Sequence, residues 1–409
     1  MEEYRTYTLE ELSIGKGSYG IAASAVPFDA TLHTYLRITD INDDGSLNKS
    51  GLMSVDEGDA EKYLLKPNDI VFARTGNSTG RSYFYDGSDG ELVYAGFLIK
   101  FSLDSAKVNP RILKYYTHSK PYYDWVQSFG TGSTRGNINA KTYGKMPITL
   151  PPRDIQDKIV DMLKSLDDKI EVNRQINDNL EKQAQALFKS WFVDFEPFKD
   201  GEFVESEFGL IPKGWKVVSL SDIADYINGL AMQKYRPQDN ESGLPVLKIK
   251  ELGQGRTDES SELCSPSLIG SKYIIDDGDI IFSWSGTLMV KVWCGGKCGL
   301  NQHLFVVEPK ELPQWFVYQW TKHHLDNFIH IAKDKAVTMG HIKRGELDKA
   351  KVVVPNKINL ANIDLMMKPL HNQIISNMKE SRRLASLRDT LLPRLMSGEL
   401  KVNEIENVI

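Results

Sequence analysis

Residues 159–191 read IVDMLKSLDDKIEVNRQINDNLEKQAQALFKSW, and mostly apolar side chains recur in them at alternating steps of four and three. Residues 363–395 show the same spacing. A seam that recurs every 3.5 residues over this length is typical of a coiled coil rather than of an ordinary surface helix. We therefore predict two long helices that pack on each other through a seam that includes Leu166, Ile170, Asn173, Leu180, Leu187, Leu370, Ile374, Asn377, Leu384 and Leu391.

The two helices belong to a duplicated module. Residues 134–192 align with residues 338–396 without a gap, and 13 of the 59 pairs are identical. Chance pairing would give only about four identities, so duplication with divergence is the better explanation. The match continues upstream at an offset of 210, where Asp69, Ile70, Phe72 and Gly76 correspond to Asp279, Ile280, Phe282 and Gly286. The repeat therefore includes the globular part of each half.

A pseudo-two-fold axis between the halves would make the helix pair antiparallel, with one globular domain at each end. Roughly 30 residues at 1.5 Å each give a rod of about 45 Å, which would act as a spacer. The matched seam residues Asn173 and Asn377 would cost stability but help to fix the register of the pair. One large domain with these segments as core helices is the alternative.

Length and composition agree with two domains in a soluble protein. The chain has 409 residues, with 41% hydrophobic and 26% charged residues, which is too long for one compact domain and ordinary in composition. Three cysteines give no disulfide framework, and the start Met1-Glu2-Glu3 lacks the features of a signal peptide. Because no apolar run approaches the length of a membrane span, we expect a cytoplasmic protein without a membrane partner.

The predicted fold is of the α+β class. Two similar mixed α/β domains are separated by two long helices packed as an antiparallel coiled coil, with pseudo-two-fold symmetry. The expected boundaries are 1–150 for the first domain, 151–195 for the central helix, 196–213 for a linker, 214–355 for the second domain, 356–402 for the C-terminal helix and 403–409 for a tail.

Within each half we expect short strands and turns, followed by short helical segments. Strand-like residues 64–72 and 273–282 lead to Gly-containing polar loops at 74–81 and 283–287. Helical pieces are expected near 109–127 and 313–331. Most of their aromatic side chains are assigned to core packing, namely Tyr115, Tyr116, Tyr122, Tyr123, Trp125, Trp315, Phe316, Tyr318, Trp320 and Phe328.

A second polar loop in each half precedes a short strand. Residues 129–141 lead to the strand at 146–150, and residues 333–344 lead to that at 350–355. These loops offer the Arg, Lys, Asn and hydroxyl groups that contact base edges and phosphates. The residue types differ between the halves while the frame matches, as two copies that read different DNA sequences would require. Neutral divergence of loops predicts the same difference.

Positive charge is concentrated although the net charge is -5. Residues 1–104 hold 9 Lys and Arg against 17 Asp and Glu, whereas residues 105–145 hold 7 against 1. The matching residues 313–351 hold 7 against 4. Local basic surface of this kind can neutralise phosphates. An ordinary solvated face without a nucleic-acid partner is the alternative explanation of the charge.

Motifs for catalysis are incomplete. Residues 15–20 form a G-x-G-x-x-G sequence that resembles the glycine loop of protein kinases, but the chain has no H-R-D or D-F-G sequence. The P-loop and the N-P-P-[FYW] sequence of amino-methyltransferases are also missing. Cys294, Cys298 and His303 are three residues of types that bind zinc, but the first half has no equivalent. We therefore predict neither a catalytic site nor a metal site.

Three motifs carry a resemblance to a known family. The sequence SWFVDFEP at 190–197 closes the first helix, GLIPKGW at 209–215 opens the second half, and LPRLMSGEL at 392–400 ends the second helix. In combination they resemble the DNA specificity subunit of type I restriction-modification systems. The resemblance covers essentially the whole chain, and the order of domains and helices agrees with it.

The resemblance implies that residues 1–150 and 214–355 are target recognition domains, each of which reads half of a split double-stranded DNA site. The helices would set the gap and dock two methyltransferase (modification) subunits, and restriction subunits would join that complex. S-adenosylmethionine would be used by the methyltransferase subunits, so this chain would bind no cofactor directly and would have no active site. An interaction scaffold that does not bind DNA is the competing function.

The candidate DNA contacts lie in the polar loops and in two further segments, near residues 18 and 234. They are Ser18, Tyr19, Arg74, Thr75, Asn77, Ser78, Thr79, Arg81, Thr131, Ser133, Thr134, Arg135, Asn137, Asn139, Lys141, Lys234, Tyr235, Ser283, Trp284, Ser285, Thr287, Lys291, Lys335, Thr338, His341, Lys343 and Arg344.

Overall fold

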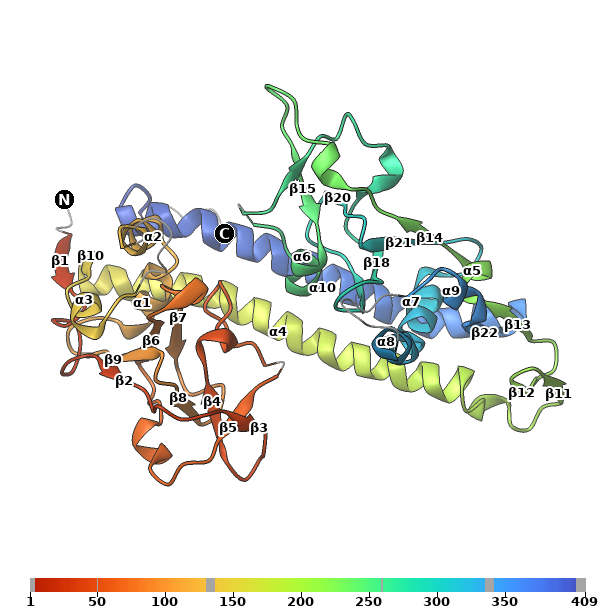
Figure 1. The fold of residues 1–409 in the computed structure, drawn as a ribbon, viewed down its shortest axis with the longest axis horizontal. Coiled ribbons are helices and arrows are strands. Elements are labelled where there is room, and N and C mark those ends of the chain that lie inside the picture. The colour runs from red at the N-terminus through yellow and green to blue at the C-terminus, as the bar shows by residue number, and fades with distance from the viewer. Residues whose placement is uncertain (1–3, 50, 130–136, 259, 335–341, 402–409) are drawn as a thin grey trace. The chain divides into compact units, whose positions relative to one another are not determined.

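The computed structural model describes residues 4–49, 51–129, 137–258, 260–334 and 342–401. The chain divides into two compact units, of which unit 1 contains residues 1–167 and 386–409 and unit 2 contains residues 168–385. Each unit holds one globular domain together with parts of the two long helices (Figure 1). We call the globular part from β1 (Arg5–Thr8) to β10 (Pro147–Leu150) domain 1 and the part from β13 (Lys216–Ser219) to β22 (Lys351–Val354) domain 2.

Both predicted long helices are present. Helix α4 extends over Arg153–Phe192 and helix α10 over Lys357–Ser397, so each begins several residues before the quoted seam. Every predicted seam residue is buried or half-buried, including Leu166, Ile170, Leu370 and Ile374. The 3.5-residue pattern therefore identified the packed face of both helices.

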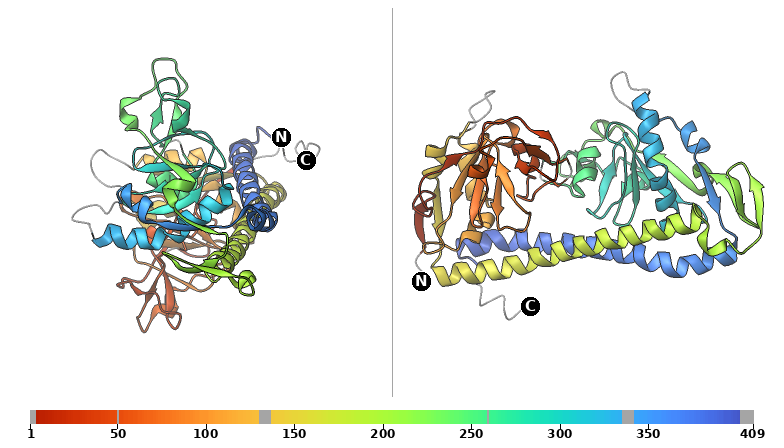
Figure 2. Two further views of the ribbon diagram at one scale, coloured as in Figure 1. Left: turned by 90° about the vertical axis from the view of Figure 1, so that its right-hand side faces the viewer. Right: turned by 90° about the horizontal axis from the view of Figure 1, so that it is seen from below.

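The two helices pair in opposite directions within each unit (Figure 2). In unit 2, the Asn377 Nδ2 group donates a hydrogen bond of 2.8 Å to Asn177 Oδ1, and Asn173 Nδ2 lies 3.4 Å from the Ser381 hydroxyl. In unit 1, residue 167 meets residue 388. The residue numbers of the partners in α10 thus increase as the residue numbers in α4 decrease. This is the antiparallel pairing that the duplication predicted.

The two polar pairs of the seam are related by the internal repeat. An offset of 204 carries Asn173 onto Asn377 and Asn177 onto Ser381, so the pair of residues 173 and 381 is equivalent to the pair of residues 377 and 177. The matched Asn173 and Asn377 do not bond to each other. Each instead faces the other's neighbour one turn away, namely Ser381 for Asn173 and Asn177 for Asn377, which defines one register for the pair.

Replacement of Asn377 by Leu should destabilise unit 2 by about 1–3 kcal/mol, because the half-buried Asn177 amide would lose a partner. Replacement of Asn177 and Asn377 together should recover most of this loss, since two apolar side chains leave no unpaired amide from this contact. A double-mutant cycle in urea unfolding measures the coupling energy between the two sites. Simple additivity of the two single changes would contradict the pairing.

Domain 1 contains two four-stranded sheets, ordered β2-β9-β6-β7 and β3-β5-β4-β8, and the two-stranded sheet β1-β10. Its strands are β1 (Arg5–Thr8), β2 (Ser18–Tyr19), β3 (Val26–Pro27), β4 (His33–Leu36), β5 (Met53–Val55), β6 (Asp69–Ala73), β7 (Ser82–Tyr85), β8 (Leu92–Tyr94), β9 (Leu98–Ser102) and β10 (Pro147–Leu150). Its helices are α1 (Pro110–Tyr116), α2 (Lys120–Gln127) and α3 (Ala140–Gly144).

Domain 2 contains the sheets β14-β21-β18-β19, β16-β15-β20-β17 and β13-β22. Its strands are β13 (Lys216–Ser219), β14 (Ala224–Asn228), β15 (Leu244–Leu247), β16 (Leu263–Cys264), β17 (Ile274–Ile275), β18 (Ile280–Ser283), β19 (Met289–Val292), β20 (Cys298–Leu300), β21 (Leu304–Pro309) and β22 (Lys351–Val354). Its helices are α5 (Leu220–Ile223), α6 (Ile249–Gln254), α7 (Gln314–His323), α8 (Leu325–Asp334) and α9 (Gly345–Lys349). The predicted linker holds a hairpin of β11 (Phe203–Ser206) and β12 (Gly209–Pro212).

The two domains share one topology. Strands β2, β9, β6 and β7 correspond in order and direction to β14, β21, β18 and β19, and β4 pairs with β8 in parallel as β15 does with β20. A close backbone approach is also repeated. A Cβ atom on Gly20 would lie 2.2 Å from the Tyr94 carbonyl oxygen, and one on Gly229 would lie 2.2 Å from the Leu300 carbonyl oxygen. Only glycine fits either position, so the duplication extends to backbone packing.

The core of each domain continues onto its part of the helix pair. In domain 1 the rings of Phe72 and Tyr143 stack at 4.7 Å, and the same cluster includes Ile159 from α4 and Leu395 from α10. In domain 2 the aromatic side chains of α7 pack against Phe188 and Phe192 of α4. Most of the aromatic residues assigned to the core are buried there, as predicted, whereas Tyr123 is 42% exposed.

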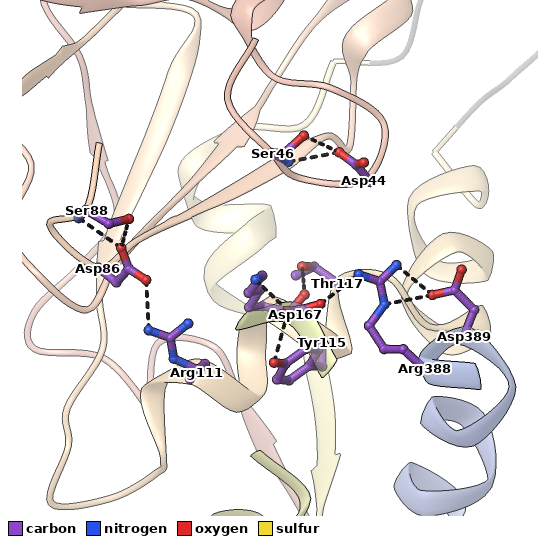
Figure 3. Close-up of polar contacts among 11 residues, drawn as sticks. Asp44, Ser46, Asp86, Ser88, Arg111, Tyr115, Thr117, Asp167, Arg388 and Asp389 are labelled. Atoms are coloured by element: carbon purple, nitrogen blue, oxygen red, sulfur yellow. Dashed lines mark hydrogen bonds and ion pairs between the residues drawn. The ribbon is translucent and has the colours of Figure 1, made fainter. Parts of the chain in front are cut away.

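An ionic cluster also joins domain 1 to the helices of unit 1 (Figure 3). Asp167 of α4 accepts a hydrogen bond of 2.8 Å from Lys114 of α1 and one of 2.8 Å from Arg388 of α10, while the Tyr115 hydroxyl donates to it at 3.1 Å. Burial acts to raise the pKa of Asp167, but the charges of Lys114 and Arg388 outweigh burial and lower it. The Asp167 carboxylate therefore links α1, α4 and α10 through hydrogen bonds.

Candidate nucleic-acid interface

The predicted polar loop of domain 1 begins with Arg74, directly after β6. The Arg74 backbone N–H donates to the Phe97 carbonyl oxygen at 3.1 Å, and the Arg74 carbonyl oxygen accepts from the Ile138 N–H at 3.0 Å. Its guanidinium group lies 5.1 Å from the centre of the Tyr19 ring and 6.0 Å from that of the Phe97 ring. The backbone is therefore held on both sides, and the charged group lies against two aromatic rings.

This cation–aromatic group is accessible. Tyr19 is 42% exposed and Phe97 is 56% exposed, which is unusual for large aromatic side chains in a domain with a well-packed core. Arg74 is half-buried. Among the residues that the structure describes, no carboxylate pairs with Arg74 and its buried Nε has no hydrogen-bond partner. The guanidinium group therefore keeps donors for a ligand.

The last residues of the second predicted loop dock beside Arg74. A β-bridge joins Thr75 to Asn137, and the Ala140 N–H donates to the Tyr19 hydroxyl at 3.1 Å. Asn139 caps α3 by accepting a hydrogen bond from the Thr142 N–H, and Lys141 in α3 is exposed. The two polar loops that were predicted separately thus meet at one place. The predicted contacts Thr131, Ser133, Thr134 and Arg135 lie outside the described residues.

Trp284 occupies the equivalent position in domain 2, directly after β18. The Ile342 N–H donates to the Trp284 carbonyl oxygen at 3.2 Å, as Ile138 does to Arg74. The Trp284 indole N–H donates to Asn228 Oδ1 at 3.0 Å, and its ring stacks on Phe305 at 5.6 Å. His303 lies on another side of the indole, with ring centres 6.3 Å apart.

A shallow cavity of about 310 Å³ adjoins Trp284 and is lined by Asn228, Trp284, Phe305, Ile342, Lys343 and Arg344. The Arg344 guanidinium lies 5.6 Å from the centre of the Phe305 ring, and both Lys343 and Arg344 are exposed. Domain 2 therefore also combines cations with aromatic rings, but its residues differ from those of domain 1. Lys335, Thr338 and His341, which were predicted as contacts, lie outside the described residues.

Several predicted contacts have structural roles instead. Ser78, Ser283 and Ser285 are buried, and the Ser283 hydroxyl donates to the Ser285 carbonyl oxygen at 3.2 Å. Arg81 forms an ion pair of 2.6 Å with Asp43. A buried hydroxyl is not accessible to DNA, and the Arg81 guanidinium is held by Asp43, so these positions are better explained by contacts within their own domains.

Four more predicted positions bond within their own domains. The hydroxyl of Ser18 lies 2.9 Å from the Tyr94 hydroxyl, and that of Thr79 donates to the Gly76 carbonyl oxygen at 2.8 Å. Lys291 donates to the Gly253 carbonyl oxygen at 2.7 Å, and burial lowers its pKa. Tyr235 packs in a small separate cluster around Met232.

The remaining candidates keep accessible polar groups. Asn77, Asn137, Asn139, Lys141, Lys234, Thr287, Lys343 and Arg344 are exposed, and Thr75 is half-buried. Three residues next to the site were not predicted, namely Phe97, Asn228 and His303. Their local sequences carry no binding motif. Only alignment of β2 with β14 and of β9 with β21 would have placed them beside positions 74 and 284.

The glycine motif and the cysteines take part in packing. A Cβ atom on Gly17 would lie 2.5 Å from the Phe101 ring, so this glycine permits close contact with β9. Cys264, Cys294 and Cys298 are buried free thiols, and burial raises the pKa of Cys298 to about 12. The described residues contain no cluster of three His, Cys, Asp or Glu suited to a metal ion. Nor does any helix among them have the length and hydropathy of a membrane span.

Comparisons with known proteins agree on one family. The family model described as type I restriction modification DNA specificity domain matches residues 6–182 and 212–381. The type I restriction enzyme MjaIX specificity subunit of Methanocaldococcus jannaschii is 30% identical over 302 residues, covering 72% of this chain and 69% of that protein. The HindI specificity subunit of Haemophilus influenzae is 23% identical over 406 residues, covering 83% and 88%. The crystal structure of an S subunit from M. genitalium has a TM-score of 0.50 at 16% identity, covers 97% of this chain and 96% of that one, and supports the fold.

Proposed function

Because this chain belongs to the family of type I restriction-modification DNA specificity subunits, we propose that each of its two domains reads one half of a split double-stranded DNA site. Specificity subunits are non-catalytic and distinct from the methyltransferase and restriction subunits of these systems. The chain would therefore supply sequence recognition to enzymes that it binds.

The main support for this proposal is that the same backbone arrangement carries a different set of side chains in each domain. Arg74 and Trp284 follow equivalent strands, and their carbonyl oxygens accept from Ile138 and Ile342 in the same way. The groups around them are Tyr19 and Phe97 in domain 1 but Asn228 and His303 in domain 2. A conserved frame with exchanged polar groups would let two copies present different hydrogen-bonding patterns to base edges.

The long helices supply the remaining part of the proposal. We propose that they set the gap between the half-sites and dock two methyltransferase subunits, through which restriction subunits join the complex. S-adenosylmethionine would be bound by the methyltransferase subunits and not by this chain. The acidic balance of residues 1–104 suggests that these partners supply part of the grip on phosphates.

The function can be tested with the full chain and candidate methyltransferase subunits. We expect the complex to bind DNA with an affinity that falls steeply between about 50 and 200 mM salt, since phosphate contacts release counterions. Sequencing of methylated adenines after co-expression should return a motif with two defined parts and a gap of fixed length. An affinity for DNA that is absent or independent of salt would favour a scaffold instead, and a continuous motif would contradict the reading of two half-sites.

A further inference from the structure

We propose that Arg74 reads a guanine in the half-site recognised by domain 1, and that domain 2 makes no equivalent contact because Trp284 occupies the same position. This inference rests on the proposed function and assigns one position in each domain that determines specificity. The chemistry required is a planar pair of acceptors such as O6 and N7 of guanine, which an arginine fork contacts with two hydrogen bonds.

Arg74 differs from three other arginines of domain 1 in the groups that its guanidinium contacts. Arg37, Arg81 and Arg111 each form an ion pair with an aspartate, at distances of 2.6, 2.6 and 2.8 Å. Arg74 contacts aromatic rings instead, and its Nε has no partner among the described residues. Among the described residues no aspartate or glutamate pairs with Arg74, so a base would displace no ion pair when it contacts the terminal amino groups.

The surroundings of Arg74 restrict its orientation. Its backbone is held by Phe97 and Ile138, and rings lie against its side chain. An arginine that is ordered before binding loses less side-chain entropy when it forms a fork of two hydrogen bonds. A phosphate contact needs only a nearby positive charge. The exposed faces of Tyr19 and Phe97 offer apolar surface beside the cation, which suits the edge and methyl groups of bases in the major groove better than the charged backbone.

Domain 2 lacks this arrangement at the matching position. The Trp284 indole N–H is already donated to Asn228, and the Arg344 guanidinium lies over Phe305 on another segment. The side chain at position 284 therefore cannot form a fork of two donors. The two half-sites should differ at the base pairs that face these positions.

The test uses the full chain in complex with its methyltransferase subunits and duplexes that carry the motif found by methylation mapping. Each base pair of the first half-site is replaced in turn, and each guanine is also replaced by 7-deazaguanine, which lacks the N7 acceptor. The wild-type complex should lose about 10-fold or more in affinity at one guanine on either change. Arg74→Ala should bind the unmodified site about 10- to 100-fold more weakly and should no longer respond to changes at that guanine, while all other preferences remain.

Two further variants separate charge from geometry. Arg74→Lys keeps the positive charge but not the fork, so it should retain salt-dependent binding and lose the preference at the same guanine. Lys66→Ala removes an exposed lysine that precedes β6 at the other end of the strand, and it should leave every base preference unchanged. Thermal unfolding of each variant checks that the domain is intact.

The outcomes are distinct. If Arg74→Ala weakens binding equally for all sequences and reduces the slope of affinity against salt by about one ion, Arg74 contacts a phosphate and the inference is wrong. If the wild-type complex binds its site specifically but Arg74→Ala keeps every preference, the inference is also wrong while the proposed function stands. If the wild-type complex shows no specific site at all, the proposed function itself fails.

Discussion

A chain that lacks residues 173–179 of α4 and 375–381 of α10 should recognise half-sites about three base pairs closer together than the intact protein does. One heptad is about 10 Å long, and one turn of B-DNA of 34–36 Å contains about 10 base pairs. The expected change follows from the proposal that the helices set the gap. Methylation mapping of the shortened complex measures the gap directly.

The two removed segments face each other in the antiparallel pair, because residue 173 meets residue 381 and residue 177 meets residue 377. Removal of seven residues from each helix also preserves the 3.5-residue pattern, so the seam remains continuous. The deletion takes away the polar layer of the seam, which requires a control. A full-length chain with Leu at positions 173, 177, 377 and 381 lacks the same polar layer and should keep the original gap. An unchanged gap in the shortened chain would refute the spacer.

Replacement of Asp167 by Ala should destabilise unit 1 by about 2–3 kcal/mol. The carboxylate bonds to Lys114, Tyr115 and Arg388, and its side chain is only 13% exposed. Breaking a fully buried ion pair costs about 3–5 kcal/mol, and partial exposure of Lys114 reduces that figure. Hydrogen exchange should report the loss in peptides from α1 and from the last turns of α10, which the carboxylate joins.

The effect should depend on pH in a defined direction. Lys114 and Arg388 outweigh burial and hold the pKa of Asp167 below its ordinary value. A carboxylate with a lowered pKa in the folded state stabilises above the pKa of the unfolded chain, near 4, and loses this contribution as the pH falls through the lowered value. The difference between wild type and Asp167→Asn should therefore be full at pH 7 and shrink below about pH 4.

Asp161→Ala is the matched control for this cluster. Asp161 lies on the same helix and is exposed, so its replacement should change stability by less than about 0.5 kcal/mol. Equal exchange rates in α1 for Asp167→Ala and wild type would show that the cluster contributes nothing.

The helices and the duplication could be predicted because both depend on patterns within the sequence. The seam spacing identified the packed faces of α4 and α10, and the offset of 204 relates the two polar pairs of the seam. The cluster at Asp167 could not be predicted. Asp167 is separated from Lys114 by 53 positions in the sequence and from Arg388 by 221 positions. A charged residue on an amphipathic helix gives no sign of its partner.

Prediction from sequence was limited in the same way for single residues of the candidate site. Polar loops were identified correctly around Arg74 and Trp284, but composition did not distinguish buried serines such as Ser283 from accessible groups. The residues that were missed lie on or directly before neighbouring strands, and sheet pairing rather than sequence proximity brings them to the site. Phe97 precedes β9, and its carbonyl oxygen accepts from the Arg74 N–H. The position of a strand within a sheet had to be known before these residues could be identified.

The core of domain 1 includes Leu391, Leu392 and Leu395, which leave the ribosome long after the rest of that core. More than 200 residues separate them from Ile159 and Leu163, against which this core is built. At roughly 5–20 residues per second, synthesis of that stretch takes about 10 to 40 s. The N-terminal domain must therefore wait for the final helix turns, with apolar surface uncovered, while residues 168–385 can fold first. We therefore expect the core of domain 1 to be completed after that of unit 2, and its apolar surface to be accessible to chaperones and proteases during that interval.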